Sequence, residues 1–502
     1  MAAVCRIMRY VLATAALLLQ FANPLAAASC ASSEEFPLPL SAYETMAGAH
    51  AYSSWGSIAE TVLFRLRAVP LNGLVTLFFI AAIGHIFLGG MLTARSHRLR
   101  EMYVCTDPGR TLRRRLLDFR ARLWHILGEI ELPFAMWAVP SLASIAIFYG
   151  PSSLAKYVEK ISFAEPIFIV AIMAVASTRP ILQIAETVLS LIARFFGGTA
   201  TSWWFAILLA APPLGSLITE PAAMTIAAIL LAKKFYPLGP SERLSYGTLG
   251  LLFANISVGG ALTHFAAPPI LMVAGRWQWT TAYVFMNIGI RAICGIIFAT
   301  ATYGIIFRRE LAKLKCAATA DVVGRRCPPW VIICHIAFMI WIVCSLHSPT
   351  NVIGGFAVFL VFSRCTSRHQ SKLRLRESTF VGIFLAGLAI HGGMQGWWME
   401  PLLMGLKPLA LFAMAASLSS FNDNAAVTYL TSMVPSFHGN CALQNAVVSG
   451  AVCSGGLTVI ANAPNPAGQA LLKNYFSSGV SPFKLFLSAA LPTAIMAFCF
   501  LV

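Results

Sequence analysis

The chain has 502 residues, of which 58% are hydrophobic and 11% are charged, and its net charge is +17. This number of charged residues is too small to cover the surface of a soluble protein of this length. The composition therefore excludes an ordinary soluble globular protein. We expect an all-α polytopic membrane protein with roughly ten to twelve membrane segments, each about 20 residues long. The basic residues gather in short stretches between apolar runs, at 95–122, 308–326 and 364–376. This pattern is typical of cytoplasmic loops next to anionic lipid, and it argues against nucleic-acid binding.

The N-terminal segment has the features of a secretory signal peptide. Arg6 and Arg9 precede an apolar stretch, and small residues at 26–28 match a cleavage site, so residues 1–28 are expected to be removed. The alternative is that they remain as a first membrane helix. Residues 29–68 are expected to form an extracytoplasmic segment.

Residues 69–307 are expected to form a first transport repeat, oriented by its basic loops. Straight membrane helices are expected at 69–94, 127–149 and 161–178. An amphipathic helix on the inner surface is expected next, at 180–196. After two irregular segments, a last straight membrane helix is expected at 281–307.

Two segments of this repeat contain strong helix breakers. The apolar run 201–232 is too long for one straight helix and carries Thr219-Glu220-Pro221 in its second half, so we expect a re-entrant hairpin of two half-helices. The run 246–275 is interrupted by two glycines at 259–260 and two prolines at 268–269, which predicts a broken membrane helix.

A basic cytoplasmic linker at 308–328 leads to a second repeat at 329–502. Its straight helices are expected at 329–346, 351–363, 380–398 and 482–502. Another overlong run, 405–435, is broken around Asn422-Asp423-Asn424 and predicts a second hairpin, while 443–471 predicts a second broken helix. Glu400, near a helix end, is expected at the membrane interface.

The irregular segments of the two repeats share short sequence motifs. EPAAMT at 220–225 and DNAAVT at 423–428 both read acid-x-Ala-Ala-x-Thr, and GGALTHFA at 259–266 matches GGLTVIA at 455–461 with one residue skipped. The basic loops give the two repeats opposite orientations. Inverted repeats with paired hairpins and broken helices predict a secondary transporter with a binding site at the membrane midplane, working by alternating access of an elevator type.

The candidate binding residues lie at the hairpin tips and helix breaks. A carboxylate near the bilayer centre costs about 2.5–3.5 kcal/mol on insertion scales, so two acids at matched positions are best explained by a bound cation or proton. Such a cation would take hard oxygen ligands. We expect these to come from Glu220, Asp423, Thr219, Asn422, Asn424, Thr263, Thr458, Asn462 and Asn465. The alternative is that both acids only cap half-helices, at about 1 kcal/mol each.

His264 follows Thr263 directly and is a candidate proton partner. The alternative is a histidine that is hydrogen-bonded for packing alone. No metal other than the transported cation is expected, because the twelve cysteines form no CxxC pair and no Cys/His ligand spacing.

The strings GSLITEPAAMTIAAILL, FNDNAAVTYL and GGLTVIANAPNPAGQALL resemble the family of bacterial sodium/proton antiporters. That family is related to a wider group with divalent-anion/sodium symporters and the arsenite-efflux membrane subunit. The resemblance implies a multi-pass protein of the bacterial inner membrane, with homodimerisation as a family-level expectation. In the anion symporters the tips carry Ser-Asn-Thr, whereas here two acids at the tips should repel a dicarboxylate and favour a cation.

Three functions follow as hypotheses. The first is exchange of Na⁺, or another monovalent cation, for H⁺ at Glu220 and Asp423, with no cofactor beyond the transported ions. The second is ion-coupled transport of a small anion or metalloid on the same fold, with half-helix N-termini holding the anion. The third, a membrane enzyme, is disfavoured because the chain has no HExxH and no GxSxG motif.

Overall fold

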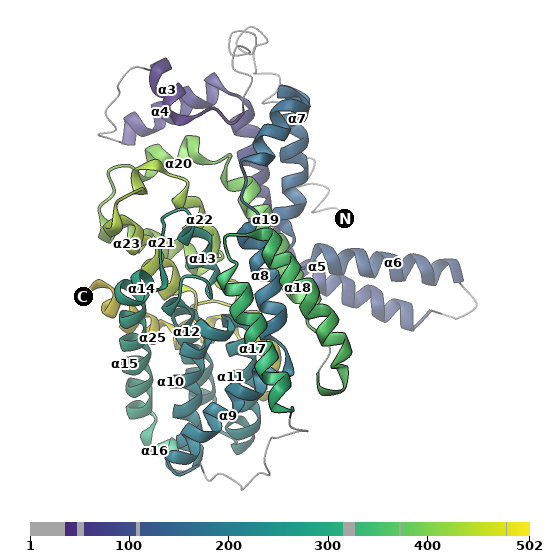
Figure 1. The fold of residues 1–502 in the computed structure, drawn as a ribbon, viewed down its shortest axis with the longest axis vertical. Helices are drawn as coiled ribbons and strands as arrows, with labels where there is room; N and C mark the ends of the chain where they lie inside the picture. Colours follow the sequence, from purple (N-terminus) through teal and green to yellow (C-terminus); the bar gives the residue numbers. More distant parts are fainter. Residues whose placement is uncertain (1–35, 48–54, 107–110, 315–326, 371–372, 478) are drawn as a thin grey trace. The chain divides into compact units, whose positions relative to one another are not determined.

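The computed structural model describes residues 36–47, 55–106, 111–314, 327–370, 373–477 and 479–502, so the expected signal segment at 1–28 lies outside the described residues. The described part of the chain is built of helices and contains no named strand, which confirms the all-α expectation (Figure 1). Many helices begin at or next to a proline, although prolines also lie inside α7, α10, α20 and α25.

The α-helices run in this order: α3 (Leu40–Ala47), α4 (Trp55–Ala68), α5 (Leu71–Val104), α6 (Thr111–Leu127), α7 (Pro133–Glu159), α8 (Ala164–Ala176), α9 (Arg179–Phe195), α10 (Ala200–Ile218), α11 (Glu220–Lys234), α12 (Glu242–Gly259), α13 (Pro268–Ala274), α14 (Thr281–Val284), α15 (Ile290–Ile306), α16 (Arg308–Leu311), α17 (Pro329–Cys344), α18 (Pro349–Cys365), α19 (Leu375–Gly392), α20 (Gly396–Leu403), α21 (Pro408–Phe421), α22 (Asn424–Ser432), α23 (Cys441–Ser454), α24 (Asn465–Leu472) and α25 (Pro482–Leu501).

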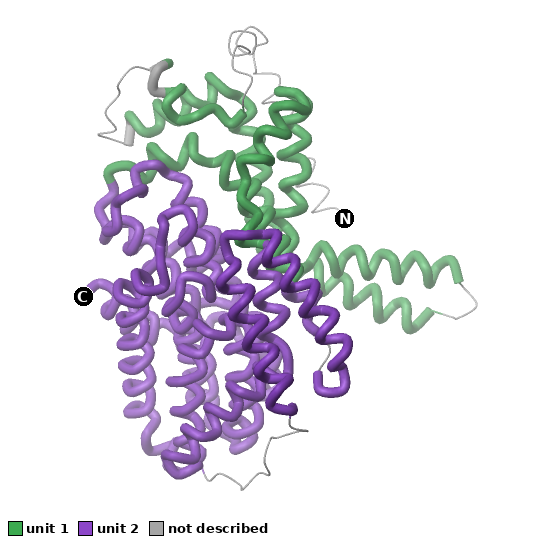
Figure 2. Tube along the Cα trace, in the orientation of Figure 1, with its two compact units in different colours: residues 1–166, 379–405 green, residues 167–378, 406–502 purple. Residues whose placement is uncertain are grey.

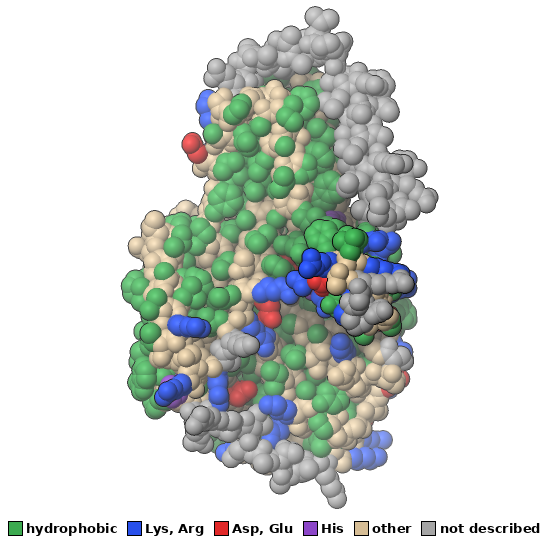
Figure 3. Space-filling model, turned by 90° about the vertical axis from the view of Figure 1, so that its right-hand side faces the viewer, with side chains coloured by type: hydrophobic (Ala, Val, Ile, Leu, Met, Phe, Trp, Pro, Cys, Tyr) green, Lys and Arg blue, Asp and Glu red, His purple; other side chains and the backbone are tan. Residues whose placement is uncertain are grey.

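Six of the described helices are long and apolar enough to cross a membrane, and two bent helix pairs bring the number to eight. The bent pairs are α8 with α9, at 65°, and α19 with α20, at 78°. The ten to twelve segments expected from the sequence also included the stretches that form the shorter apolar helices α17, α18, α21 and α23. Hydrophobic side chains cover much of the face drawn in Figure 3, as lipid contact requires.

The chain divides into two compact units (Figure 2). The first comprises residues 1–166 and 379–405, and the second comprises residues 167–378 and 406–502. Apart from Gly405, the second unit contains all four irregular segments that the sequence singled out, 201–232, 246–275, 405–435 and 443–471.

A buried ion pair joins α4 to α20 in the first unit. Arg65 Nη2 lies 2.9 Å from Glu400 Oε2, and Arg65 Nη1 donates to the Trp397 carbonyl at 2.9 Å. The Arg65 guanidinium also lies over the Tyr43 ring. Glu400 is only 6% exposed, so it is a buried partner of Arg65 in addition to a helix-end residue.

Within the basic stretch at 95–122, residues 95–104 and 111–122 are helical rather than a loop, contrary to the expectation from their charge. α5 continues to Val104, and α6 packs back against it through Leu92, Leu99, Ala121 and Trp124. Ser96 Oγ donates a hydrogen bond to the Ala121 carbonyl at 2.7 Å. Apolar residues at helical spacing between the arginines supply this contact, and a reading based on charge alone overlooks them.

In the second unit, each expected hairpin consists of two helices that meet at a sharp bend. α10 and α11 meet at Thr219, and α21 and α22 meet at Asn422 and Asp423. The two expected broken helices are interrupted as well, since α12 is separated from α13 by residues 260–267 and α23 from α24 by residues 455–464.

The halves of these elements pack in a crossed manner within the second unit. α11 packs against α24, α22 packs against α13, and the longer helices α12 and α23 pack against each other. The hairpin helix of one part of the sequence therefore contacts the half-helix that follows the break in the other part. The two tips and the two breaks are brought together by this arrangement.

Candidate ion-binding site

Glu220 begins α11 with its carboxylate inside the protein. The residue is 0% exposed, and its Oε2 accepts a hydrogen bond from Asn462 Nδ2 at 3.0 Å. Within the described part of the chain, Glu220 Oε1 has no hydrogen-bond partner. A buried charged oxygen without a partner is costly, so this position calls for a proton or a cation.

The backbone around Glu220 is shaped to admit this carboxylate. Thr219 has φ of 73°, which is strained for a β-branched residue, and Pro221 continues α11 directly after Glu220. A Cβ on Gly260, at the first helix break, would collide with the Glu220 carboxyl group. Glycine at 260 therefore leaves the space that the acid occupies.

Asp423 lies at the second tip and caps α22. Its Oδ1 accepts a hydrogen bond from the Ala425 amide at 2.8 Å, and Asn422 Oδ1 accepts one from the Asp423 amide at 3.0 Å. Asp423 is half-buried. Capping of α22 is thus the role of Asp423 that the structure shows.

Three asparagines surround Gly455 at the second break. Asn424, Asn462 and Asn465 are each at most 1% exposed. A Cβ on Gly455 would come within 2.9 Å of Asn424 Nδ2 and 3.5 Å of the Asn462 Cβ, and Asn465 Nδ2 donates to the Gly455 carbonyl at 2.8 Å. The backbone N–H of Asn424 also donates to the Ala461 carbonyl at 3.2 Å. These contacts link the second tip to the second break.

The side-chain oxygens of these three asparagines have no hydrogen-bond partner among the described residues. Through Asn462, the group joins the Glu220 carboxylate. Buried carboxylate and amide oxygens without partners are the kind of ligand that a hard cation takes. The structure therefore brings Glu220, Asn424, Asn462 and Asn465 into one polar cluster.

Thr263 and Thr458 connect each break to the hairpin of its own part of the sequence. Thr263 Oγ1 donates to the Ser216 carbonyl at 2.9 Å, and Thr458 Oγ1 donates to the Ser420 carbonyl at 2.7 Å. Each hydroxyl is used in fixing a hairpin, because each carbonyl acceptor lies three or four residues before the acid of that tip.

His264 makes its hydrogen bond to a residue outside the polar cluster around Glu220. Its Nδ1 lies 2.6 Å from Thr281 Oγ1, and its ring contacts Phe265 edge-on. The carboxylates of the two tips are not among its recorded partners.

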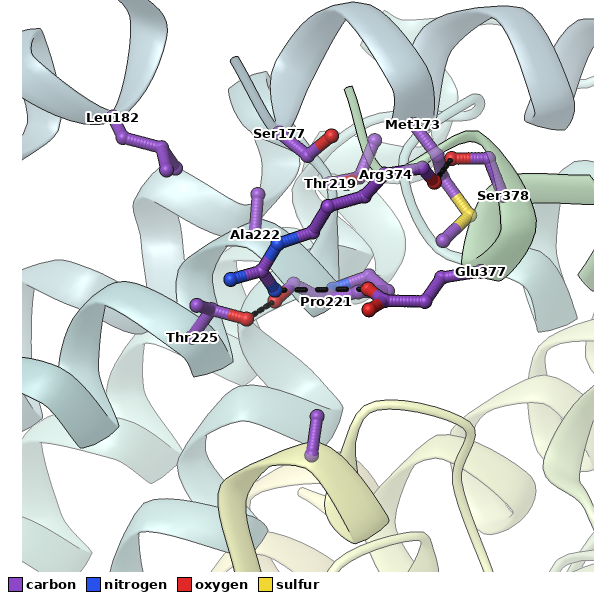
Figure 4. A pocket seen from close by; sticks show the side chains of 11 residues that line it. Met173, Ser177, Leu182, Thr219, Pro221, Ala222, Thr225, Arg374, Glu377 and Ser378 are labelled. Carbon is purple, nitrogen blue, oxygen red and sulfur yellow. Dashed lines mark hydrogen bonds and ion pairs between the residues drawn. The ribbon is translucent and has the colours of Figure 1, made fainter. Parts of the chain in front are cut away.

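A pocket of about 40 Å³ lies beside the first tip (Figure 4). Thr219, Pro221 and Thr225 line it on one side, and Arg374 and Glu377 line it on another. On sequence alone, Arg374 belongs to the basic stretch at 364–376 and Glu377 has no assigned role, because nothing in the local pattern ties residues 374–377 to the hairpin. An acid that directly follows a run of basic residues was the one available signal.

Comparisons with known proteins bear on the family. No curated protein matches the chain. Among solved structures, the crystal structure of the YdaH transporter of Alcanivorax borkumensis is similar over 74% of this chain and 96% of that chain, with 12% sequence identity and a TM-score of 0.44. A family model described as "Putative Na+/H+ antiporter" matches residues 70–502. With this match over most of its length and several membrane-spanning helices, the chain belongs to that family of multi-pass membrane transporters.

Proposed function

We propose that the protein exchanges Na⁺, or another monovalent cation, for H⁺ at the cluster around Glu220. The observation that carries the proposal is the fully buried Glu220 carboxylate, with one oxygen bonded to Asn462 and the other without a partner among the described residues. A cation and a proton would compete for this carboxylate, and competition for one site produces exchange when the site opens to either side of the membrane in turn.

The neighbouring groups have distinct proposed roles. Asn424, Asn462 and Asn465 offer amide oxygens to the cation, and Asp423 adds a second negative charge while it caps α22. Thr263 and Thr458 hold the hairpins against the breaks, which positions the ligands. Broken helices whose ends and free carbonyls surround an ion are a recurrent device of secondary transporters.

The matching motifs and the matching Thr contacts support inverted repeats and, with them, an alternating-access mechanism of the elevator type. Such an exchanger would function in the bacterial inner membrane, and a homodimer is the assembly we expect.

The second candidate function is ion-coupled transport of a small anion or metalloid. It is favoured by Arg374, a cation that lines the pocket beside the start of α11, since a helix N-terminus and a guanidinium together suit an anion. The two acids at the tips weigh against it.

Proteoliposomes loaded at one pH and diluted into Na⁺ at another pH test the proposal. Wild type should exchange Na⁺ for H⁺, Glu220→Gln should lose exchange, and Asp423→Asn should slow it even though Asn still caps a helix. Glu242→Gln is the control, because Glu242 is exposed and pairs with Lys484 on the surface. Wild-type rates in both Glu220→Gln and Asp423→Asn would refute the site. A wild type that moves no cation but takes up a small anion with Na⁺ would establish the second function.

A further inference from the structure

The pocket beside the first hairpin tip contains a pair of opposite charges. Arg374 Nη1 and Glu377 Oε2 lie 3.6 Å apart, and their side chains are 40% and 67% exposed. Figure 4 shows Arg374 extending across the pocket above Pro221, with Glu377 beside it. Exposed pairs of this kind are weak and open readily, so the two charges can separate.

The other side of the pocket is lined by neighbours in sequence of the candidate site residues. Thr219 and Pro221 line the pocket and flank Glu220 in the sequence, and Ala467 lines it from α24, two residues after Asn465. The pocket therefore borders both the tip that carries Glu220 and the half-helix that carries one of the clustered asparagines. The other lining groups, such as Ser177 and Ser378, are neutral.

We propose that this pocket is the route by which the cation reaches Glu220 from solvent, and that the Arg374–Glu377 pair controls its access. This inference rests on the proposed cation exchange. Glu377 attracts a cation into the pocket and Arg374 repels it, so the net charge of the pair sets the local cation concentration beside the tip. While the pair is closed the two charges cancel.

The two single substitutions must then act in opposite directions. Arg374→Gln leaves Glu377 unopposed and should lower the KM for Na⁺, while Glu377→Gln leaves Arg374 unopposed and should raise it. Each change should be about tenfold at low ionic strength, the lower end of what charge focusing in a cleft produces. The double variant should return close to the wild-type KM, and added choline chloride should shrink both differences because it screens exposed charges.

Proteoliposome exchange at several Na⁺ concentrations measures these constants. The matched controls are Glu242→Gln and Lys484→Gln, an exposed pair of the same unit that does not line the pocket. Single variants at positions 374 and 377 that shift the KM in the same direction, or leave it unchanged in an exchanging protein, would overturn the inference alone. A wild type that exchanges no cation would overturn the proposed function and the inference together.

A second observation, on α6, stands independently of the transported ion. Five large apolar side chains of α6 are exposed and recur at alternating spacings of four and three residues, which places them on one helix face: Leu112, Leu116, Phe119, Leu123 and Ile126. The face with Ala121 and Trp124 packs against α5 instead. The exposed stripe thus has no cover within the described part of the chain.

Five arginines lie along the same helix: Arg113, Arg114, Arg115, Arg120 and Arg122. Asp118 is its single acid, and it pairs with Arg122 at 2.8 Å. A second copy of α6 laid on the stripe would bring two strongly cationic helices together, which is unfavourable. An apolar stripe edged by arginines matches instead a bilayer surface with anionic headgroups.

We infer that α6 lies on the membrane with its apolar stripe among acyl chains and with Arg113, Arg115 and Arg120 on anionic phosphate groups, while Arg114 stacks on Tyr103 of α5. The full-length protein in nanodiscs is photocrosslinked with phosphatidylglycerol or phosphatidylcholine probes, and the crosslinked residues are mapped by mass spectrometry. Residues 111–127 should react mainly with the phosphatidylglycerol probe.

The triple variant Arg113→Gln/Arg115→Gln/Arg120→Gln, which keeps the stripe and the Asp118–Arg122 pair, should lower that yield several-fold. The matched control Arg308→Gln/Arg309→Gln/Arg368→Gln removes the same charge elsewhere and should leave the yield unchanged. Equal yields from both lipid probes, or crosslinks between two copies of 111–127 in place of lipid, would overturn the inference.

Discussion

Asn462 donates a hydrogen bond from Nδ2 to Glu220 Oε2 at 3.0 Å, although the two residues are 242 positions apart in the sequence. Glu220 starts the second helix of the first hairpin, and Asn462 lies in the break of the second broken helix. This one bond therefore joins the two parts of the chain at the candidate site. Its donor favours the charged carboxylate, the form that binds a cation.

Replacement of Asn462 by Ala should weaken cation binding. The variant removes a hydrogen bond to a charged group, which is worth about 1.5–3 kcal/mol, so the KM for Na⁺ at fixed pH should rise roughly tenfold or more. Asn287→Ala is the control, because the Asn287 side chain donates to the Tyr283 carbonyl one turn earlier in the same helical segment. The Asn287 carbonyl, which accepts from Arg291, is kept in this variant. An Asn462→Ala protein with the wild-type KM would show that the bond has no part in binding.

The glycine beside Glu220 gives a second prediction. A Cβ at position 260 would meet the Glu220 carboxyl group, whereas a Cβ at Gly354 would meet nothing within 4 Å. Overpacking of this kind costs about 1–3 kcal/mol, and here it falls on the carboxylate itself. Gly260→Ala should therefore lose most of its exchange activity in proteoliposomes, while Gly354→Ala should keep it. Equal rates for the two variants, each confirmed as folded by its thermal unfolding, would contradict the tight fit at Gly260.

The irregular segments could be predicted from the sequence because their breakers act locally. Pro221 and the run Asn422-Asp423-Asn424 both disfavour a helix that continues through the tip, and in the structure a helix ends and a new one begins at each. The repeated acid-x-Ala-Ala-x-Thr motif also pairs Glu220 with Asp423 on sequence alone.

The contacts between distant segments could not be predicted in the same way. No local pattern says that Asn462 meets Glu220 or that Arg374 and Glu377 line a pocket beside Thr219. The charge pattern also misled at 95–122, where arginines suggested a loop and the interleaved apolar residues form α6. For Asp423 the sequence offered ion binding or helix capping as alternatives, and the contact that the structure shows is the cap of α22.

The threonine at the second break gives a third prediction. Thr458→Val keeps the shape of the side chain but removes the donor to the Ser420 carbonyl, a bond of 2.7 Å. Loss of such a bond costs about 0.5–1.5 kcal/mol, so amide hydrogen exchange at the second tip, residues 421–425, should become about 2- to 12-fold faster. Thr302→Val is the control, because Thr302 is partly exposed and its hydroxyl donates to the Phe298 carbonyl of its own helix. Unchanged exchange at 421–425 would mean that the tip is held by other contacts.

The last prediction concerns the buried Arg65–Glu400 pair, whose side chains are 2% and 8% exposed. Glu400→Gln removes the negative partner and leaves the Arg65 charge buried, so it should destabilise the first unit by about 3–5 kcal/mol. The double variant Arg65→Leu/Glu400→Leu removes both charges and should recover most of that loss, because apolar residues of similar volume often replace a buried pair without cost. Asp118→Asn is the control, since it breaks the exposed Asp118–Arg122 pair, which should contribute little. Thermal unfolding in detergent measures all three. If Glu400→Gln lowers the unfolding temperature no more than Asp118→Asn does, the ion pair does not hold α4 to α20. The contacts of Arg65 with the Trp397 carbonyl and the Tyr43 ring would then be sufficient to stabilise its buried charge.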